Sequence, residues 1–286
     1  MDTGRVTIYA VTWNNEQFIE MTVRRIHETT SYPFRLVVSE NKSENSPSIR
    51  EKLISLKEQG LIDKLYLYDG NYVGTSGRYT IEHDEPDRLK EHRSFYVRTD
   101  HDAYITSLWE EIPDWLEHYA QVFDDKHCDI EAIRMASNRF WLAKYFNDSL
   151  DGNDDRNLRG WIYQSKIEGK LHNEYAYLSK RFIRTNNHFQ AVTERVMKSW
   201  FTSKPNSNPV DGVLEPWLIK QKNMHVYTPA YVENLSIYQQ FPDPKNRISL
   251  DPDYVKARKK VFGQGKNELG YNFYDYAPQN ITYKIL

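Results

Sequence analysis

Four short runs of β-branched, aliphatic and aromatic residues are spaced through the first hundred positions of the chain, with segments of helical character between them. The runs are Val6–Val11, Phe34–Val38, Lys64–Tyr68 and Phe95–Thr99. Short apolar runs bounded by turn residues predict buried strands. Because strands that alternate with helices favour a parallel sheet with helices on its faces, we expect an α/β protein built on a mostly parallel sheet.

The connections between these runs differ in character. The first connection is predicted to form a helix over residues 16–29. The second is predicted to form a helix that begins at Ser46-Pro47, with proline at the first helical position, and ends at Gly60. The inward positions of the first helix are predicted to be Phe18, Met21, Val23 and Ile26. The third connection, Asn71–Tyr79, is interpreted as a glycine-containing loop. Further along, Phe189–Phe201 is predicted to be helical.

Polar residues follow all four strand ends, at Thr12, Glu40, Asn71 and Asp100. In parallel sheets, ligands collect at the carboxyl ends of the strands. We therefore expect these four residues to line a binding site at one edge of the sheet.

Asp100 and Asp102 are two carboxylates two residues apart, directly after the fourth run. Hard divalent cations such as Mg²⁺ and Mn²⁺ take carboxylate oxygens together with substrate phosphates. A metal site that serves a nucleoside diphosphate donor is one interpretation of this pair. The alternative is an acidic turn in solvent at the end of a strand.

The bulk composition narrows the function classes. With 286 residues, of which 39% are hydrophobic and 27% charged, the chain has enough apolar surface for one large domain or two small ones. The net charge of −2 excludes a global basic field, so nucleic acid or a membrane would have to meet a local patch. Lys256–Lys260, in a predicted basic helix at residues 254–262, is the candidate patch, or else a solvated helix face.

Cysteine content and hydropathy indicate a compartment. Cys128 is the single cysteine, so neither an intrachain disulfide nor a cysteine-based zinc site is expected. The first residues lack an apolar signal core, and no run approaches the roughly 20 apolar residues of a membrane span. We therefore expect a cytoplasmic protein without an integral membrane segment.

Four segments lie at the strand ends in a fixed order: Val11–Glu16 with Phe18-Ile19 after it, Val37–Ser43, Asn71–Arg78 and Asp100–Asp102. With these segments, the N-terminal part of the chain resembles the family 2 glycosyltransferases of the GT-A fold. Glu40 stands where the family usually has Asp, and Tyr79 stands where it has Asn.

A fifth segment, Asp211–Leu218, resembles the one that carries the family's catalytic acid. A predicted strand and Pro229 follow it, and Asn234 stands where the family has a metal-binding His. The resemblance extends over residues 6–240.

The resemblance implies a Rossmann-like GT-A catalytic domain over residues 1–240, with a C-terminal extension over residues 241–286 packed on it. It implies a metal-dependent, inverting glycosyltransferase that moves a sugar from a nucleotide donor, with a UDP-sugar favoured, to a hydroxyl acceptor. The acceptor would be a glycan, a lipid carrier, a protein or modified DNA. The implied metal is Mn²⁺ or Mg²⁺.

The resemblance also implies roles for single residues. Asp100, Asp102 and Asn234 would hold the metal. Glu215, with Asp211 as the second candidate, would be the general base that takes the proton of the acceptor hydroxyl. The residues implied to bind the nucleotide sugar are Thr12, Trp13, Asn14, Glu40, Asn71, Gly74, Arg78 and Asp100.

Structural alternatives stand beside three of these roles. Asn14 is also suited to a helix cap, Arg78 to a structural ion pair, and Glu215 to the N-terminal turn of a helix.

Two other function classes compete with the transferase. Nucleotidyltransferases usually have a glycine-rich loop and a basic residue after the first strand, and Thr12–Asn15 contains neither. The other class is a binding module on a catalytically degenerate transferase scaffold, which Asn234 in place of the metal-binding His would suit.

Overall fold

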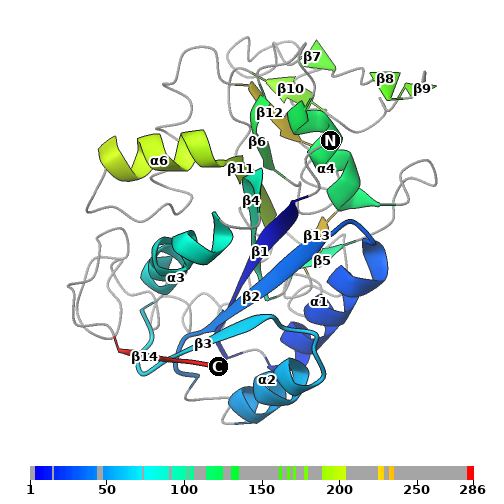
Figure 1. Cartoon of the computed structure of the whole chain (residues 1–286). Coiled ribbons are helices and arrows are strands. Elements are labelled where there is room, and N and C mark those ends of the chain that lie inside the picture. The colour runs from blue at the N-terminus through cyan, green and yellow to red at the C-terminus, as the bar shows by residue number, and fades with distance from the viewer. Residues whose placement is uncertain are drawn as a thin grey trace, which may run out of the picture.

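The structure is a computed structural model, and Figure 1 shows the whole chain. Within its described residues, no helix is long and apolar enough to cross a membrane. The described residues are 4–14, 16–43, 48–72, 74–89, 92–101, 103–105, 114–124, 130–134, 161–162, 166–167, 170–171, 177–179, 189–203, 225–228, 232–234 and 282–286.

Ten strands among the described residues form one mixed sheet. They are β1 (Arg5–Thr12), β2 (Phe34–Glu40), β3 (Lys64–Tyr68), β4 (His92–Asp100), β6 (Ile130–Arg134), β7 (Trp161–Ile162), β10 (Tyr177–Ser179), β11 (Phe189–Thr193), β12 (His225–Thr228) and β14 (Tyr283–Ile285). Their order across the sheet is β14-β3-β2-β1-β4-β11-β6-β12-β10-β7. The run β3-β2-β1-β4 is parallel throughout, while β14 and β11 flank it in the antiparallel sense.

Two short strand pairs lie outside this sheet. β5 (Ala103–Ile105) pairs with β13 (Val232–Asn234), and β8 (Lys166–Ile167) pairs with β9 (Lys170–Leu171).

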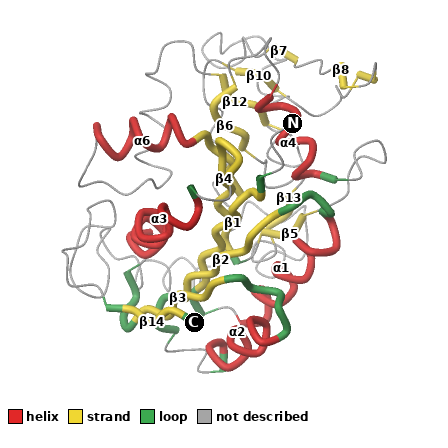
Figure 2. Tube along the Cα trace, in the orientation of Figure 1, coloured by secondary structure: helices red, strands yellow, loops and turns green. Residues whose placement is uncertain are grey.

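Helices cover both faces of the parallel strands, as Figure 2 shows. On one face lie α1 (Glu16–Thr29), α2 (Ile49–Glu58) and α4 (Trp115–Asp124), and on the other lie α3 (Gly74–Arg88) and α6 (Glu194–Ser203). The predicted α/β architecture, with a mostly parallel central sheet and flanking helices, is confirmed.

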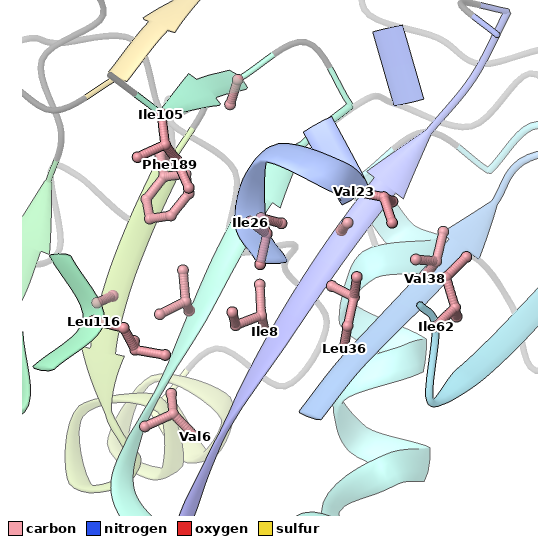
Figure 3. Close-up of a cluster of buried hydrophobic side chains, with 14 of the residues drawn as sticks. Val6, Ile8, Val23, Ile26, Leu36, Val38, Ile62, Ile105, Leu116 and Phe189 are labelled. Carbon is pink, nitrogen blue, oxygen red and sulfur yellow. The ribbon is translucent and has the colours of Figure 1, made fainter. Parts of the chain in front are cut away.

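The face under α1, α2 and α4, here called the aliphatic face, is packed with Val, Ile, Leu and Ala side chains. Strand residues alternate between faces, so Val6, Ile8 and Ala10 of β1 all lie on this side. Figure 3 shows Ile8 and Leu36 beneath Val23 and Ile26 of α1. Burying each large aliphatic side chain contributes about 1.5–3 kcal/mol.

The face under α3 and α6, here called the tyrosine face, has a different composition. Tyr9 of β1, Tyr66 of β3 and Tyr96 of β4 are buried there. The Tyr9 hydroxyl donates to Asp84 of α3 at 2.7 Å, and Asp84 also accepts two hydrogen bonds from Arg35 at 2.5 and 2.6 Å. This face therefore buries charges as well as rings.

The prediction of a loop at Asn71–Tyr79 is wrong from Gly74 onward, because α3 begins there. The segment lacks an apolar stripe, since α3 buries the acid Asp84 and the base Arg88 alongside the aliphatic Ile81. Gly74 and Pro86 within α3 also lower its intrinsic helix propensity.

The predicted helix at Phe189–Phe201 is half right. Its first five residues form β11, whose continuous burial conceals the alternation expected of a strand, and α6 begins only at Glu194. The hydroxyl of Thr193 accepts a bond from the Val196 amide at 3.3 Å, as an N-cap does.

The inward positions of α1 and the end of α2 were also predicted from the sequence. Met21 of α1 is 47% exposed, so it is not an inward position; Ile19, Val23 and Ile26 form the buried stripe. The predicted end of α2 at Gly60 is confirmed. Gly60 has a φ of 74°, and the amides of Gly60 and Leu61 bond back to Lys57 and Leu56, which is a Schellman cap.

The predicted domain boundary at residue 240 lies outside the described residues, as does the predicted basic helix at 254–262. Of the predicted extension, residues 282–286 are described. They include β14, the strand at one edge of the main sheet, which pairs with β3 (Figure 1).

Candidate functional site

The carboxyl ends of β1, β2 and β4 meet at one edge of the sheet. In the parallel register, Thr12 lies opposite Glu40, and Val11 lies opposite Asp100. The ladder continues beyond the strands, because the Asn41 amide donates to the Thr12 carbonyl and the His101 amide to the Val11 carbonyl, each at 3.0 Å. Three of the predicted strand-end positions are therefore neighbours in space.

Thr12 is fully buried at this edge. Its hydroxyl oxygen has no hydrogen-bond partner among the described residues. A buried hydroxyl without a partner costs about 1–3 kcal/mol, and the hydroxyl of Tyr96 shares this state within the described part of the core.

Glu40 is buried, and both of its carboxylate oxygens are engaged within the protein. One accepts from the Ser43 amide at 2.8 Å, and the other accepts from Nε of Arg50 at 2.7 Å. Burial raises the pKa of the Glu40 carboxyl above its ordinary value, and the bonds from Ser43 and Arg50 oppose that rise. Glu40 therefore anchors the turn after β2 to the first residues of α2.

Arg50 was not found from the sequence. Its guanidinium also donates to the Tyr68 carbonyl, so it ties the ends of β2 and β3 together beside Glu40. The available signal was a basic residue in the first turn of the helix that follows a buried acid, but surface helices carry many such residues.

Asn14 has a φ of 55°, in the left-handed region that asparagine tolerates better than most residues. Its amide donates to the hydroxyl of Ser43 at 3.0 Å, and that hydroxyl in turn donates to the Asn41 carbonyl at 3.0 Å. Asn14 and Trp13 thus lie in the turn between β1 and α1, joined to the turn after β2.

Asn71 is buried beside this turn, in the segment between β3 and α3. The next amide, of Tyr72, donates to the side-chain oxygen of Asn41 at 3.2 Å, and the Lys42 amide donates to the Gly70 carbonyl at 3.3 Å. The turns after β2 and β3 are therefore held side by side.

Arg78 lies within α3 and is 97% buried, its side chain having 3% of its surface exposed. Its Nε and a terminal nitrogen donate to Glu82 at 3.1 and 2.9 Å, and its guanidinium lies 4.6 Å from the ring centre of Phe201 in α6. The contact with Glu82 is an ion pair of the kind that was the structural alternative to donor binding by Arg78. Gly74, the other predicted donor contact in this segment, is the first residue of α3.

Asp100 is the last residue of β4, and the carbonyl of His101 accepts a bond from Thr22 of α1 at 2.6 Å. Asp102 lies outside the described residues. The pairing of β5 with β13 sets Asn234 opposite Ala103, so the main chain at Asn234 adjoins the residue after Asp102. Asp100 and Asn234, the two described positions among those predicted to hold a metal, thus belong to adjoining segments.

The oxygen donors of Asp100, Asp102 and Asn234 are of the type that Mg²⁺ and Mn²⁺ prefer. Among the described residues, no three His, Cys, Asp or Glu side chains gather as a metal site. The predicted base candidates Asp211 and Glu215 lie outside the described residues.

No family model matches this chain, and neither does any curated protein sequence. Among solved structures, it is similar to residues 1–349 of TarS from S. aureus at 12% identity and a TM-score of 0.47, covering 91% of this chain and 74% of that one. The same protein in complex with UDP gives a TM-score of 0.46 at 12% identity, with the same coverage.

A mannosyltransferase from Pyrobaculum calidifontis, in complex with GDP-Man and Mn²⁺, is similar at 16% identity and a TM-score of 0.42. That match covers 69% of this chain and 46% of the mannosyltransferase, so the chain spans less than half the length of that structure. At such identities and TM-scores, the function has to be argued from the residues of this chain itself.

Proposed function

We propose that this chain is a metal-dependent glycosyltransferase that transfers a sugar from a nucleoside diphosphate donor to a hydroxyl acceptor. The observation that carries the proposal is the meeting of Thr12, Glu40 and Asp100 at one edge of a parallel sheet. Ligands of α/β proteins bind at such an edge. The buried hydroxyl of Thr12, which has no hydrogen-bond partner among the described residues, lies at the same edge and is available to bond a ligand.

The metal-binding part of the proposal assigns Asp100 and Asp102 as ligands, with Asn234 as a third. The register of β5 with β13 supports Asn234, because it pairs the main chain at this residue with Ala103, three residues after Asp100 in the sequence. A divalent cation held there would neutralise the charge that develops on the leaving diphosphate.

The proposed transfer is a single displacement. The acceptor oxygen attacks the anomeric carbon from the side opposite the diphosphate, and Glu215 or Asp211 takes the hydroxyl proton. The bond from the anomeric carbon to the β-phosphate oxygen breaks, and its electron pair leaves with the nucleoside diphosphate. The product therefore carries the inverted configuration.

Donor recognition is proposed to use the turns after β1 and β2, which contain Trp13 and Asn14, and the segment with Asn71. Glu40 acts mainly by ordering these turns, since Ser43 and Arg50 engage its carboxylate. A UDP-sugar is the favoured donor, and the hydroxyl acceptor is a glycan, a lipid carrier, a protein or modified DNA. We propose a cytoplasmic location, and a GT-A domain of family 2 type over residues 1–240 with residues 241–286 as its extension.

The test is a calorimetric titration of UDP and GDP in the presence of Mn²⁺ and then of EDTA, with Asp102→Ala in parallel. We expect one nucleotide to bind, and we expect its affinity to fall at least about tenfold in EDTA and in the variant. Asp124→Ala, which removes an exposed acid at the end of α4, is the matched control and should bind as the native chain does.

Binding of neither nucleotide by the folded protein would contradict the proposal. Nucleotide binding that persists in EDTA and in Asp102→Ala, without sugar transfer, would instead favour the binding module.

A further inference from the structure

The segment Asp69–Tyr72 connects the candidate donor site to a distant part of the chain. On the site side, Tyr72 donates its amide to Asn41, and the Gly70 carbonyl accepts from Lys42. Asn41 is bonded in turn to the carbonyl of Thr12. Hydrogen bonds therefore link Tyr72 to the turn after β2, and link that turn to the end of β1.

Asp69 accepts hydrogen bonds from two hydroxyls that lie far apart in the sequence. Its Oδ1 accepts from the Tyr72 hydroxyl at 2.6 Å, and its Oδ2 accepts from the hydroxyl of Thr282, the residue before β14. The Asp69 amide also donates to the Thr282 carbonyl at 3.2 Å. One exposed carboxylate thus links residue 72 to residue 282 across more than two hundred positions of sequence.

The electrostatics of Asp69 agree with this geometry. Its slight burial raises the pKa of the carboxyl, but the bonds from Thr282 and Tyr72 outweigh that effect and leave the pKa below its ordinary value. The carboxylate is therefore charged at neutral pH, and hydrogen bonds to a charged acceptor are stronger than neutral ones.

Packing also fixes the ring of Tyr72. A Cβ atom at Gly70 would lie only 3.0 Å from Cζ of this ring, so the ring lies directly against the glycine backbone. The Tyr72 ring meets the edge of Tyr68 at 6.0 Å between ring centres, and Tyr283 of β14 packs on Tyr68 at 5.4 Å. The hydroxyl of Tyr72 is thus held where Asp69 can bind it.

We propose that Asp69 is a positioning residue of the donor site, and that it acts by tying Tyr72 to the segment that leads into β14. Through Tyr72, the clamp of Asp69, Tyr72 and Thr282 sets the distance between the turns after β2 and β3. The effect on donor binding rests on the proposed function, whereas the effect of the clamp on the two turns does not.

The experiment compares two substitutions at one position. Thr282→Val removes the hydroxyl while keeping the shape of the side chain, and Thr282→Ser keeps the hydroxyl. Hydrogen exchange of the Tyr72 and Lys42 amides and the affinity for UDP with Mn²⁺ are measured in both. Lys284→Ala, an exposed position of β14 outside the clamp, is the matched control.

In Thr282→Val, we expect the two amides to exchange about tenfold faster, and the nucleotide affinity to fall about three- to tenfold. The midpoint of thermal unfolding should remain within about 2 °C of the native value, because the substituted residue, Thr282, is exposed. Thr282→Ser should restore both the exchange rates and the affinity, and Lys284→Ala should change neither.

Unchanged exchange at Tyr72 and Lys42 in Thr282→Val would overturn the proposal, as would an equal acceleration at all amides of the sheet. The proposed function fails separately, if the native chain binds no nucleotide. In that case, faster exchange in Thr282→Val but not in Thr282→Ser would still support the clamp.

Discussion

The two faces of the central sheet are stabilised by different chemistry. On the aliphatic face, α1, α2 and α4 pack Ile, Leu and Val side chains on the strands. On the tyrosine face, α3 packs on rings and on charges, with Asp84 entirely buried among Tyr9, Arg35 and Lys64. The first face needs only apolar area and good packing, while the second needs its buried charges to stay paired.

The second arrangement is the more fragile of the two. Arg88 of α3 donates to Tyr9 and to Glu194 of α6, and it lies 4.7 Å from the ring centre of Tyr96. Removing one member of such a network leaves the others charged and buried, whereas removing one aliphatic side chain leaves a cavity. Substitutions on the two faces can therefore compare the cost of an unpaired buried charge with the cost of a cavity.

The largest effect is expected from Asp84→Ala. The substitution leaves Arg35 buried without its carboxylate, so we expect the free energy of unfolding to fall by about 3–5 kcal/mol, measured by urea denaturation. The double variant Asp84→Leu with Arg35→Met removes both charges of the pair, and it should recover most of the loss. If the double variant is no more stable than Asp84→Ala, packing rather than charge pairing holds α3 in place.

A smaller loss is expected on the aliphatic face. Leu53 of α2 is fully buried, and Leu53→Ala should lower the free energy of unfolding by about 2–4 kcal/mol through lost burial and a residual cavity. The neighbouring Ile54 is only partly buried, so Ile54→Ala is the matched control and should cost about half as much. Equal losses at both positions would mean that burial does not govern stability on this face.

The smallest loss of stability is expected at Asp114, which joins the start of α4 to the turn after α1 on the aliphatic face. Asp114 accepts bonds from the amides of Leu116 and Glu117 at the start of α4, and from those of Ser31 and Tyr32 in the turn after α1. Burial raises the pKa of Asp114, but the bonds from Thr30 and these amides outweigh it, so the pKa lies below its ordinary value. Asp114→Asn should therefore cost about 1–2 kcal/mol at pH 7.

The sign of the pH dependence follows from that lowered pKa. The contribution of a carboxylate whose folded pKa is depressed is complete above its unfolded pKa, about 3.9, and is lost as the pH falls through the folded value. The stability difference between the native chain and Asp114→Asn should therefore shrink between pH 5 and acid pH. A difference that stays constant over this range in denaturant titrations would show that the charge of Asp114 plays no part.

The comparison of faces also explains how far the sequence allowed the fold to be predicted. Runs such as Val6–Val11 and Phe34–Val38 are apolar enough to be identified as strands, and they are strands. α3 was missed beyond Gly74 because its buried side carries Asp84 and Arg88, which resemble solvent residues in any hydropathy pattern. β11 was assigned to a helix because both of its faces are buried.

The residues of the candidate site also fall into those that could be predicted from the sequence and those that could not. Thr12, Glu40 and Asp100 could be placed from the sequence, since each lies at the end of a predicted strand and parallel strands end together. Arg50 and Asp69 could not, because their partners, Tyr68 and Thr282, are chosen by tertiary contacts that no local pattern records. The functional roles of Asp102, Asp211 and Glu215 stay predictions.

Strand β14 also has a consequence for solubility. β3 is a short run, Lys64–Tyr68, of alternating Leu and Tyr after its first residue, a sequence with high β propensity. Without β14, its outer backbone groups would be open to pairing with another chain, whereas in the structure Leu65 exchanges both of its backbone bonds with Leu286. A chain that lost residues 282–286 would expose an edge able to recruit copies of itself, and self-association would then compete with folding.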